Sequence, residues 1–462
     1  MTFIGREQET RMLQSVLHND KQENILIYGR RRVGKSELIK HTLSRETLPF
    51  LYYECKQTSE LNNVNSLAAL LAERDHLPPL AFASLEELLT FFFRQAEQKP
   101  QILVLDEYPY LRETVKGLDS ILQTLIDTYG NHSKLKLILC GSYIDTMKNL
   151  VLAHNPLYGR ITKVINLKPM DYFESSLFYP AFSTEDKVRL YSVFGGIPYY
   201  NKLVDEHLTV AENIRILLSA PGARLENEVA MYLHAELAKL NNANEVFDTL
   251  AKGNGHFSDL LSQSHISSSP TLTDILKRLM QMELVKKTAP INDENNRKRA
   301  TYGIADNLAL FYFRYLYRFS SQRNLMDPDT FYERYIQKDF EQSYVPNRFE
   351  QICAQYLIRK NRAGKIDPPF EKIGKYYYDL PKEHKNGEFD IVTLDEKGYI
   401  FYEAKFRNTP MTQAMVDQEI SQVRQAGLPC YRFGFFSKAG FTAQKDGQMD
   451  FYTLEDLYEN LN

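Results

Sequence analysis

Eight consecutive residues decide the fold of the first part of the chain: Gly29-Arg30-Arg31-Arg32-Val33-Gly34-Lys35-Ser36. They fit the pattern Gly-x-x-x-x-Gly-Lys-Ser/Thr of phosphate-binding loops. Residues 24–28 before them are typical of a buried strand, and residues 37–43 after them of a helix. A glycine loop between a strand and a helix directs backbone N–H groups and the helix N-terminus at phosphate. The alternative is a chance Gly-Lys-Ser turn, which would not require those flanking elements.

The residue types in this loop match the chemistry of ATP and Mg²⁺. Gly29 and Gly34 allow the backbone to curl around the phosphates. Lys35 is expected to contact the β- and γ-phosphates, and the Ser36 hydroxyl to bind Mg²⁺. We therefore predict that residues 29–36 bind ATP together with Mg²⁺.

Polar residues follow two further predicted strands. Residues 101–105 form an apolar run that ends in Asp106 and Glu107, as in central strands buried on both faces. Asp106 is expected to bind Mg²⁺ and Glu107 to polarise the attacking water. A third strand, 136–141, ends at Ser142, which either senses the γ-phosphate or caps a helix over 143–150. Strands that alternate with helices predict a parallel, doubly wound sheet.

This set of motifs resembles the archaeal-type ATPases, a family of the AAA- and STAND-related P-loop branch that also occurs in bacteria. The resemblance also rests on Phe3-x-Gly5-Arg6-Glu7, Gly141-Ser142, Tyr158-Gly159-Arg160 and residues 195–200. It implies that residues 3–7 lie near the adenine. It also implies that Arg160 is a γ-phosphate sensor or an arginine finger, whereas the structural alternative is a surface salt bridge. An arginine that acts in trans requires a homo-oligomer.

Composition excludes several classes of protein. Apolar residues make up 43% and charged residues 25% of the 462 residues, and the net charge is −3. There is thus no global positive field for nucleic acid. The four cysteines are scattered, which argues against a disulfide framework or a zinc site. With no signal-peptide pattern and no long apolar run, we expect a cytoplasmic protein without a membrane partner.

The middle of the chain has the pattern of a winged helix-turn-helix. Helices are predicted over 246–250, 257–263 and from Thr271, with Thr271 and Asp274 as a capping box. A hairpin of 284–288 and 300–304 follows. The archaeal-type ATPases carry such a module at this place. DNA phosphates would meet cations of the third helix and the wing, and the alternative is a module that only packs against protein. These cations are Lys277, Arg278, Arg297, Lys298 and Arg299.

Two acids and a lysine mark the C-terminal region. Residues 387–394 and 399–406 are predicted to pair as a hairpin. A turn of two or four residues places Asp390 opposite Glu403, with Lys405 on the face of Glu403, whereas a three-residue turn places Ala404 opposite Asp390. Such a cluster binds a hard divalent ion through oxygen. The alternative is a cross-strand salt bridge between Lys405 and its acids.

The sequence Asp390…Glu403-Ala404-Lys405 resembles the PD-(D/E)XK nuclease fold over residues 345–462, a short motif that also arises by chance. The resemblance implies that Asp390 and Glu403 hold Mg²⁺ and that Lys405 positions the attacking water. It further implies that Glu350, from the preceding helix, is another acidic ligand. Gln418 or Gln422, from the following helix, would contact the site. The archaeal-type ATPases commonly end in such a domain.

We therefore predict an α/β multidomain protein that binds and hydrolyses ATP and whose nucleotide state controls DNA binding and metal-dependent DNA cleavage. Two alternatives stay open: a regulatory or signalling ATPase with a catalytically silent C-terminal binding domain, and a scaffold for protein partners. The predicted parts are a P-loop ATPase core (1–170), a helical lid (171–240), a winged helix-turn-helix (241–310), a helical linker (311–344) and a restriction-endonuclease-like α/β domain (345–462).

Overall fold

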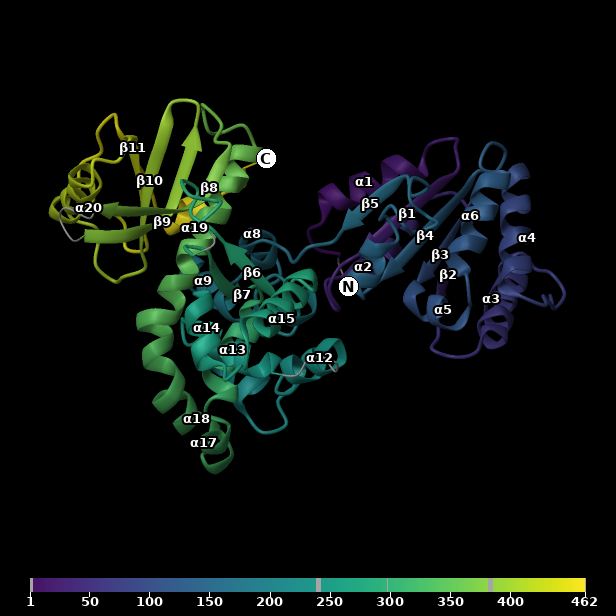
Figure 1. The fold of residues 1–462 in the computed structure, drawn as a ribbon, viewed down its shortest axis with the longest axis horizontal. Coiled ribbons are helices and arrows are strands. Elements are labelled where there is room, and N and C mark those ends of the chain that lie inside the picture. The colour runs from purple at the N-terminus through teal and green to yellow at the C-terminus, as the bar shows by residue number, and fades with distance from the viewer. Residues whose placement is uncertain (1–2, 238–241, 297, 381–384, 462) are drawn as a thin grey trace. The chain divides into compact units, whose positions relative to one another are not determined.

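A computed structural model describes residues 3–237, 242–296, 298–380 and 385–461 (Figure 1). The chain divides into two compact units. One comprises residues 1–169 with 197–199, and the other residues 170–196 with 200–462. All four parts predicted after residue 170 fall into the second unit except residues 197–199, so the finer boundaries within it stay predictions.

The first unit is a five-stranded parallel sheet with helices on both faces (Figure 1). The strand order is β2-β3-β4-β1-β5, and every pairing is parallel. This confirms the parallel α/β core that alternating strands and helices predict. The strands are β1 (Glu23–Tyr28), β2 (Phe50–Glu54), β3 (Gln101–Asp106), β4 (Leu135–Gly141) and β5 (Lys163–Asn166). The helices are α1 (Glu7–Leu17), α2 (Lys35–Leu43), α3 (Glu60–Arg74), α4 (Leu85–Gln98), α5 (Tyr108–Thr114), α6 (Leu118–Tyr129) and α7 (Ile144–Asn149).

The core of this unit explains why its strands are continuous apolar runs. Every residue of β3 and β4 is buried. Side chains alternate along a strand, so Ile102 and Val104 join one core cluster, while Leu103 and Leu105 join the other. Both faces are covered, so the polar ends of the strands are left at the edges of the sheet.

The second unit begins with a helical region. Its π-helical segments continue α-helices, as in α11 with η1 and α16 with η2. The elements before the hairpin are α8 (Tyr172–Ser176), α9 (Thr184–Phe194), α10 (Pro198–Asn201, which begins within the first unit), α11 (Val210–Ile214), η1 (Arg215–Ser219) and α12 (Glu228–Leu237). Those after it are α16 (Asn307–Phe311), η2 (Tyr312–Tyr317), α17 (Ser320–Leu325), α18 (Pro328–Tyr332), η3 (Glu333–Gln337), η4 (Phe340–Tyr344) and α19 (Val345–Arg362).

Between these two sets lie three helices and an antiparallel hairpin, in the predicted order. They are α13 (Ala243–Ala251), α14 (Phe257–Gln263), α15 (Ser269–Gln281), β6 (Val285–Thr288) and β7 (Thr301–Ile304). The predicted capping box of Thr271 and Asp274 is wrong. Ser268 caps α15 instead, because its side chain accepts the backbone N–H of Thr271, which starts the helix one turn earlier.

The C-terminal sheet is mixed, with the strand order β12-β11-β10-β9-β8. Strands β8, β9 and β10 are antiparallel, and β10, β11 and β12 are parallel. Helix α20 packs on one face through Val416, Ile420 and Val423. The remaining elements are β8 (Lys372–Leu380), β9 (Lys385–Asp395), β10 (Gly398–Lys405), α20 (Gln413–Gln425), β11 (Cys430–Ser437), β12 (Met449–Tyr452) and α21 (Leu454–Leu457).

Candidate functional site

The loop after β1 needs its two glycines for different reasons. A Cβ on Gly29 would lie 2.3 Å from the carbonyl oxygen of Leu167, so the close approach of the two chain segments excludes a side chain. Gly34 has a φ of +95°, which favours glycine on conformational grounds. Helix α2 begins at the next residue, Lys35, so the N–H groups of its first turn point toward the loop.

Lys35 is buried and folds back over this loop. Its Nζ donates to the carbonyl oxygens of Gly29 and Arg30, both at 3.0 Å. A neutral carbonyl oxygen forms a weaker hydrogen bond with the ammonium than a phosphate anion does. The loop of residues 29–36 therefore surrounds a buried ammonium group, that of Lys35.

Ser36 and Asp106 form a pair of oxygen donors at the carboxyl end of β3. The Ser36 hydroxyl donates to Asp106 Oδ2 at 2.6 Å, and the Tyr52 hydroxyl donates to the same oxygen. Burial raises the pKa of Asp106, but hydrogen bonds from Cys140, Ser36 and Tyr52 outweigh burial and hold that pKa below its usual value. The carboxylate thus stays ionised. A hydroxyl beside an ionised carboxylate suits Mg²⁺, which prefers oxygen ligands and takes few from protein.

Glu107 lies beside this pair in a left-handed backbone conformation with φ +51°, which is uncommon for a residue other than glycine. The Ser142 hydroxyl lies 3.0 Å from both carboxylate oxygens of Glu107. Ser142 does not cap α7, whose N-cap position is Tyr143. The alternative in which Ser142 caps that helix is therefore wrong, because its side chain contacts Glu107 instead.

The remaining residues of the loop contact aromatic rings of the same unit. Arg31 donates to the Tyr143 hydroxyl at 3.1 Å, and the Arg32 guanidinium lies 4.2 Å from the centre of the Tyr199 ring. Val33 is buried, and Arg30 contributes the carbonyl bound by Lys35. These contacts fix the shape of residues 29–36 around Lys35.

The N-terminal motif predicted near the adenine lies against this loop. Arg6 is buried and donates to the carbonyl oxygens of Val33 at 3.3 Å and Lys168 at 2.6 Å. The Phe3 ring stacks on His41 of α2 with a centroid distance of 3.9 Å. An aromatic pair beside the phosphate loop is compatible with a base-binding position.

Arg160 lies elsewhere. Its backbone carbonyl accepts from Asn24 at the start of β1, whereas the phosphate loop follows the end of that strand. Its guanidinium forms two hydrogen bonds to Asp127, at 2.8 and 2.7 Å. The expected role as a γ-phosphate sensor of its own chain is therefore corrected to the surface salt bridge, because β1 separates Arg160 from the loop.

The hairpin of β9 and β10 has the predicted register. Asp395 pairs with Gly398 across a two-residue turn, and the ladder runs to Ile391 with Tyr402. The same register continued by one residue sets Asp390 across from Glu403. The three-residue turn is thereby excluded.

The side chains around this hairpin form one cluster of carboxylates and lysines. Lys405 pairs with Glu403 and, at 3.3 Å, with Glu419 of α20. Lys375 of β8 pairs with Asp390 at 2.8 Å and with Glu388. Each lysine thus links two carboxylates, and the cluster draws on four elements of the sheet and its helix.

Glu350 of α19 belongs to this cluster. Burial, together with the charges of Asp390 and Glu403, raises its pKa to about 8. Burial and the nearby Glu419 likewise raise the pKa of Glu403, although Lys405 opposes them. Carboxylates that repel one another in this way favour a bound cation.

Three members of the cluster were missed from the sequence: Lys375, Glu388 and Glu419. Gln418 and Gln422 of α20 are exposed, and the residue of that helix that contacts Lys405 is Glu419. The apolar positions Val416, Ile420 and Val423 could have shown which side of α20 faces the sheet. No local signal marks Lys375, which lies at a distant point of the sequence.

A metal cage is not preformed. Within the described ranges, no three His, Cys, Asp or Glu side chains are arranged to hold a metal ion together. The oxygen donors of Glu350, Asp390 and Glu403 fit Mg²⁺ in kind, but Lys375 and Lys405 now neutralise two of them. Binding of the ion would require those ammonium groups to move aside.

The cations of helix α15 and of the loop between β6 and β7 differ in exposure. Lys277 and Arg278 of α15 are exposed, as predicted, and so is Lys298. Arg299 instead pairs with Asp293 at 2.9 Å and lies 4.0 Å from the centre of the Tyr377 ring of β8. Arg297 falls outside the described residues.

The loop between β6 and β7 packs against the edge of the C-terminal sheet. The backbone N–H of Ile291 donates to the carbonyl of Lys375 at 2.7 Å. Asn292 and Tyr377 exchange two hydrogen bonds, at 2.7 and 3.1 Å. This loop covers an otherwise open edge strand, so much of the predicted wing makes protein contacts.

The part of the chain that the structure describes contains no helix long and apolar enough to cross a membrane.

Two family models match different parts of the chain. Residues 3–204 match a family described as an ATPase domain predominantly from Archaea. Residues 312–419 match a family of archaeal and bacterial proteins of unknown function. The first of these matches supports ATP binding and hydrolysis by residues 3–204.

Two relatives come from Methanocaldococcus jannaschii. An uncharacterized protein is 28% identical over 410 residues, which cover 88% of this chain and 88% of that protein. An uncharacterized ATP-binding protein is 24% identical over 260 residues, which cover 45% of this chain and 70% of that protein. Among solved structures, the Walker-type ATPase of Pyrococcus abyssi gives a TM-score of 0.49 at 21% identity, with 68% of this chain and 96% of that chain covered.

Proposed function

We propose that this chain is an ATPase whose nucleotide state controls DNA binding, and whose C-terminal sheet cleaves DNA with Mg²⁺. The single observation that carries the ATPase part is the gathering of Lys35, Ser36, Asp106 and Glu107 at one edge of the parallel sheet. The family match of residues 3–204 supports the same activity.

In the proposed reaction the chain's own groups change partners when ATP binds. Lys35 exchanges the carbonyls of Gly29 and Arg30 for phosphate oxygens, which are stronger partners for an ammonium. Ser36 and Asp106 would hold Mg²⁺, which when bound would neutralise charge on the phosphates. Glu107 accepts a hydrogen bond from the attacking water once it is released from Ser142.

The contact between Ser142 and Glu107 gives this ATPase a resting state. While both oxygens of Glu107 lie 3.0 Å from the Ser142 hydroxyl, the carboxylate is engaged within the protein. A γ-phosphate that attracts the Ser142 hydroxyl frees the carboxylate for water. Hydrolysis is then coupled to the presence of the γ-phosphate.

DNA binding is proposed for the module of α13 to α15 with the hairpin, as a winged helix. The exposed Lys277 and Arg278 on α15 support it, because phosphates bind to exposed cations on such a helix. Arg299 is not assigned to DNA, because its pairing with Asp293 and its stacking on Tyr377 would be lost.

Cleavage is proposed for the cluster around Asp390. Helix α19 precedes the hairpin of β9 and β10, and helix α20 follows it; the resemblance to the PD-(D/E)XK fold implies a helix on each side of that hairpin. Asp390, Glu403 and Glu350 would hold Mg²⁺, which when bound would lower the pKa of a water. Lys405 positions this water or offsets charge on the phosphate.

A second candidate, a regulatory ATPase with a silent C-terminal binding domain, is favoured by the ion pairs. Lys405 is held between Glu403 and Glu419, and Lys375 between Glu388 and Asp390. A cluster that neutralises itself in this way is also a stable structural element.

Incubation of plasmid DNA with the full chain, ATP and Mg²⁺ separates the candidates. The nuclease proposal expects cleavage that Lys405→Ala abolishes, while ATP hydrolysis is retained. The matched control is Lys397→Ala, which removes an exposed lysine from the turn before β10 and should cleave normally. DNA binding without cleavage by the wild type contradicts the nuclease and supports the second candidate.

A further inference from the structure

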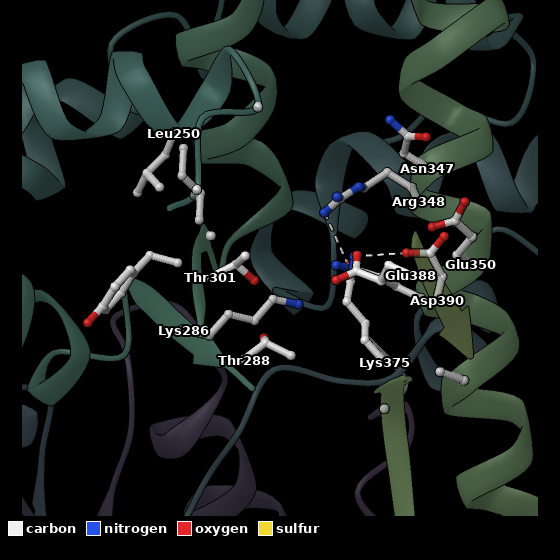
Figure 2. A pocket seen from close by; sticks show the side chains of 18 of the residues that line it. Leu250, Lys286, Thr288, Thr301, Asn347, Arg348, Glu350, Lys375, Glu388 and Asp390 are labelled. Atoms are coloured by element: carbon white, nitrogen blue, oxygen red, sulfur yellow. Dashed lines mark hydrogen bonds and ion pairs between the residues drawn. The ribbon is translucent and has the colours of Figure 1, made fainter. Parts of the chain in front are cut away.

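A pocket of about 580 Å³ lies within the second unit, beside the carboxylate–lysine cluster. The hairpin of β6 and β7 forms one wall, and α19 with β8 and β9 forms the other (Figure 2). Its volume falls within the range of ligand pockets of proteins. Three cations line it: Lys286, Arg348 and Lys375.

Two of these cations have no carboxylate partner within the described ranges. Lys286 forms no ion pair there, and Figure 2 shows its ammonium directed into the pocket. Arg348 makes one side-chain hydrogen bond, to Gln351 at 3.1 Å, and no ion pair with the described acids. Lys375 differs, because it is paired with Asp390 and Glu388.

Three carboxylates, Glu350, Glu388 and Asp390, also line the pocket. Lys375 binds Glu388 and Asp390, so Lys286 and Arg348 keep no described carboxylate at ion-pair distance. Removal of its ammonium from bulk water, together with the charges of Arg348 and Lys375, lowers the pKa of Lys286 to about 8. Burial likewise lowers the pKa of Arg348. The Lys286 side chain is open to solvent along the pocket, so an anion from solution can reach it.

The side chains of Lys286 and Arg348 together suit a phosphate group as the ligand. An ammonium is a compact point charge, and a guanidinium offers a planar fork of N–H donors. A phosphate group presents several oxygens in different directions and can accept from both at once. A monovalent carboxylate offers less charge to cations that face each other across a hollow.

We propose that this pocket is a phosphate-binding site in which Lys286 and Arg348 hold a phosphate group beside Asp390 and Glu350. The site is separate from the phosphate loop of the ATPase unit. It stands whether or not the C-terminal sheet cleaves DNA, because it requires only the two cations and the hollow between them. The phosphate comes either from a mononucleotide or from a nucleic-acid strand.

A crystal of the full chain soaked in tungstate, a phosphate analogue with strong anomalous scattering, locates the site directly. We expect an anomalous peak between Lys286 Nζ and the Arg348 guanidinium, in addition to any peak at residues 29–36. Tungstate at the phosphate loop alone overturns the proposal.

Binding in solution is measured in the Lys35→Ala background, so that the phosphate loop does not contribute. The probe is a fluorescein-labelled oligonucleotide with a 5′-phosphate, and AMP and inorganic phosphate serve as competitors. Lys286→Ala is expected to weaken binding about tenfold, as for the loss of one charge-assisted hydrogen bond. Arg348→Gln should act in the same direction, and Lys286→Ala keeps the test valid if Arg348→Gln fails to fold.

Lys287→Ala is the matched control. Lys287 is the next residue of β6, is exposed, and does not line the pocket. It should bind like the parent. Displacement of the probe by AMP assigns the site to a mononucleotide, whereas competition only by unlabelled oligonucleotide assigns it to a strand. Equal affinities of Lys286→Ala and Lys287→Ala contradict the proposal.

Discussion

The phosphate loop and the C-terminal cluster both hold charged side chains for phosphate chemistry, but they are built differently. Residues 29–36 form their site from one continuous segment, to which Asp106 and Glu107 are added at a strand end. The C-terminal cluster draws its charges from α19, β8, β9, β10 and α20. A site of the first kind depends on local backbone geometry, whereas the second depends on strand register and helix rotation.

The comparison predicts that the phosphate loop is the more vulnerable to a single change. Lys35→Ala removes the cation that neutralises the phosphates, so ATP binding and turnover should fall on the order of 100- to 1000-fold. Phosphate release and binding of a fluorescent ATP analogue measure the two effects. Lys99→Ala, which removes an exposed lysine of the same unit, should hydrolyse ATP normally. Unchanged hydrolysis by Lys35→Ala would refute the assignment of the loop.

Glu107→Gln tests the strand-end residue that completes the loop. The amide keeps the shape of the side chain but is a poor acceptor for the water proton, so turnover should fall about 100-fold. Binding of ATP should stay within about twofold, because no phosphate contact is assigned to Glu107. Equilibrium binding beside single-turnover hydrolysis separates the two quantities. A variant that loses affinity instead would place Glu107 among the groups that bind ATP.

The cluster should respond to pH in a way that the loop does not. The pKa of Glu350 is about 8 in the folded state, whereas the usual pKa of a glutamate is 4.5. The folded chain therefore keeps this proton to a higher pH. The unfolded chain therefore binds fewer protons than the folded chain between these pH values, and the stability of the fold falls as pH rises. Glu350→Gln cannot ionise, so its Tm relative to the wild type should increase from pH 5 to pH 8 by a few degrees.

The measurement is thermal unfolding without divalent ions, at several pH values. Glu396→Gln, which changes an exposed acid of the turn before β10, should keep a constant difference from the wild type. A constant difference for Glu350→Gln as well would show that Glu350 is ionised in the folded state at neutral pH.

The smallest effect is expected for Arg160, the one residue assigned to the ATP site that lies at the other end of β1. Because it pairs with Asp127 on the surface, Arg160→Ala should leave hydrolysis by dilute protein within about twofold. An arginine finger in trans predicts a large loss that grows with protein concentration, and steady-state hydrolysis over a dilution series distinguishes the two cases.

Sequence alone predicted the parts of the fold whose signals are local. The apolar runs at β1, β3 and β4, the glycine loop and the hairpin of β9 and β10 were found within one or two residues of their bounds. The register that sets Asp390 opposite Glu403 was one of two that the sequence left open, and the two-residue turn of the structure selects it.

The parts that sequence could not supply are those that tertiary contacts determine. Glu419 rather than Gln418 faces Lys405, because the rotation of α20 follows from burial of Val416, Ile420 and Val423. Arg299 packs on Tyr377, because the loop before it hydrogen-bonds the edge of β8. Ser268 replaces Thr271 at the start of α15, a choice between neighbouring residues that can each cap a helix.

The central claim is that ATP at the phosphate loop controls what the second unit does with DNA. The most direct measurement is the affinity of the full chain for a fluorescent DNA duplex at low salt, with Glu107→Gln held in ATP and the wild type held in ADP. The account predicts affinities that differ by about tenfold or more, and no nucleotide dependence in Lys35→Ala. Equal affinities in ATP and ADP, or no binding even at low salt, would contradict it.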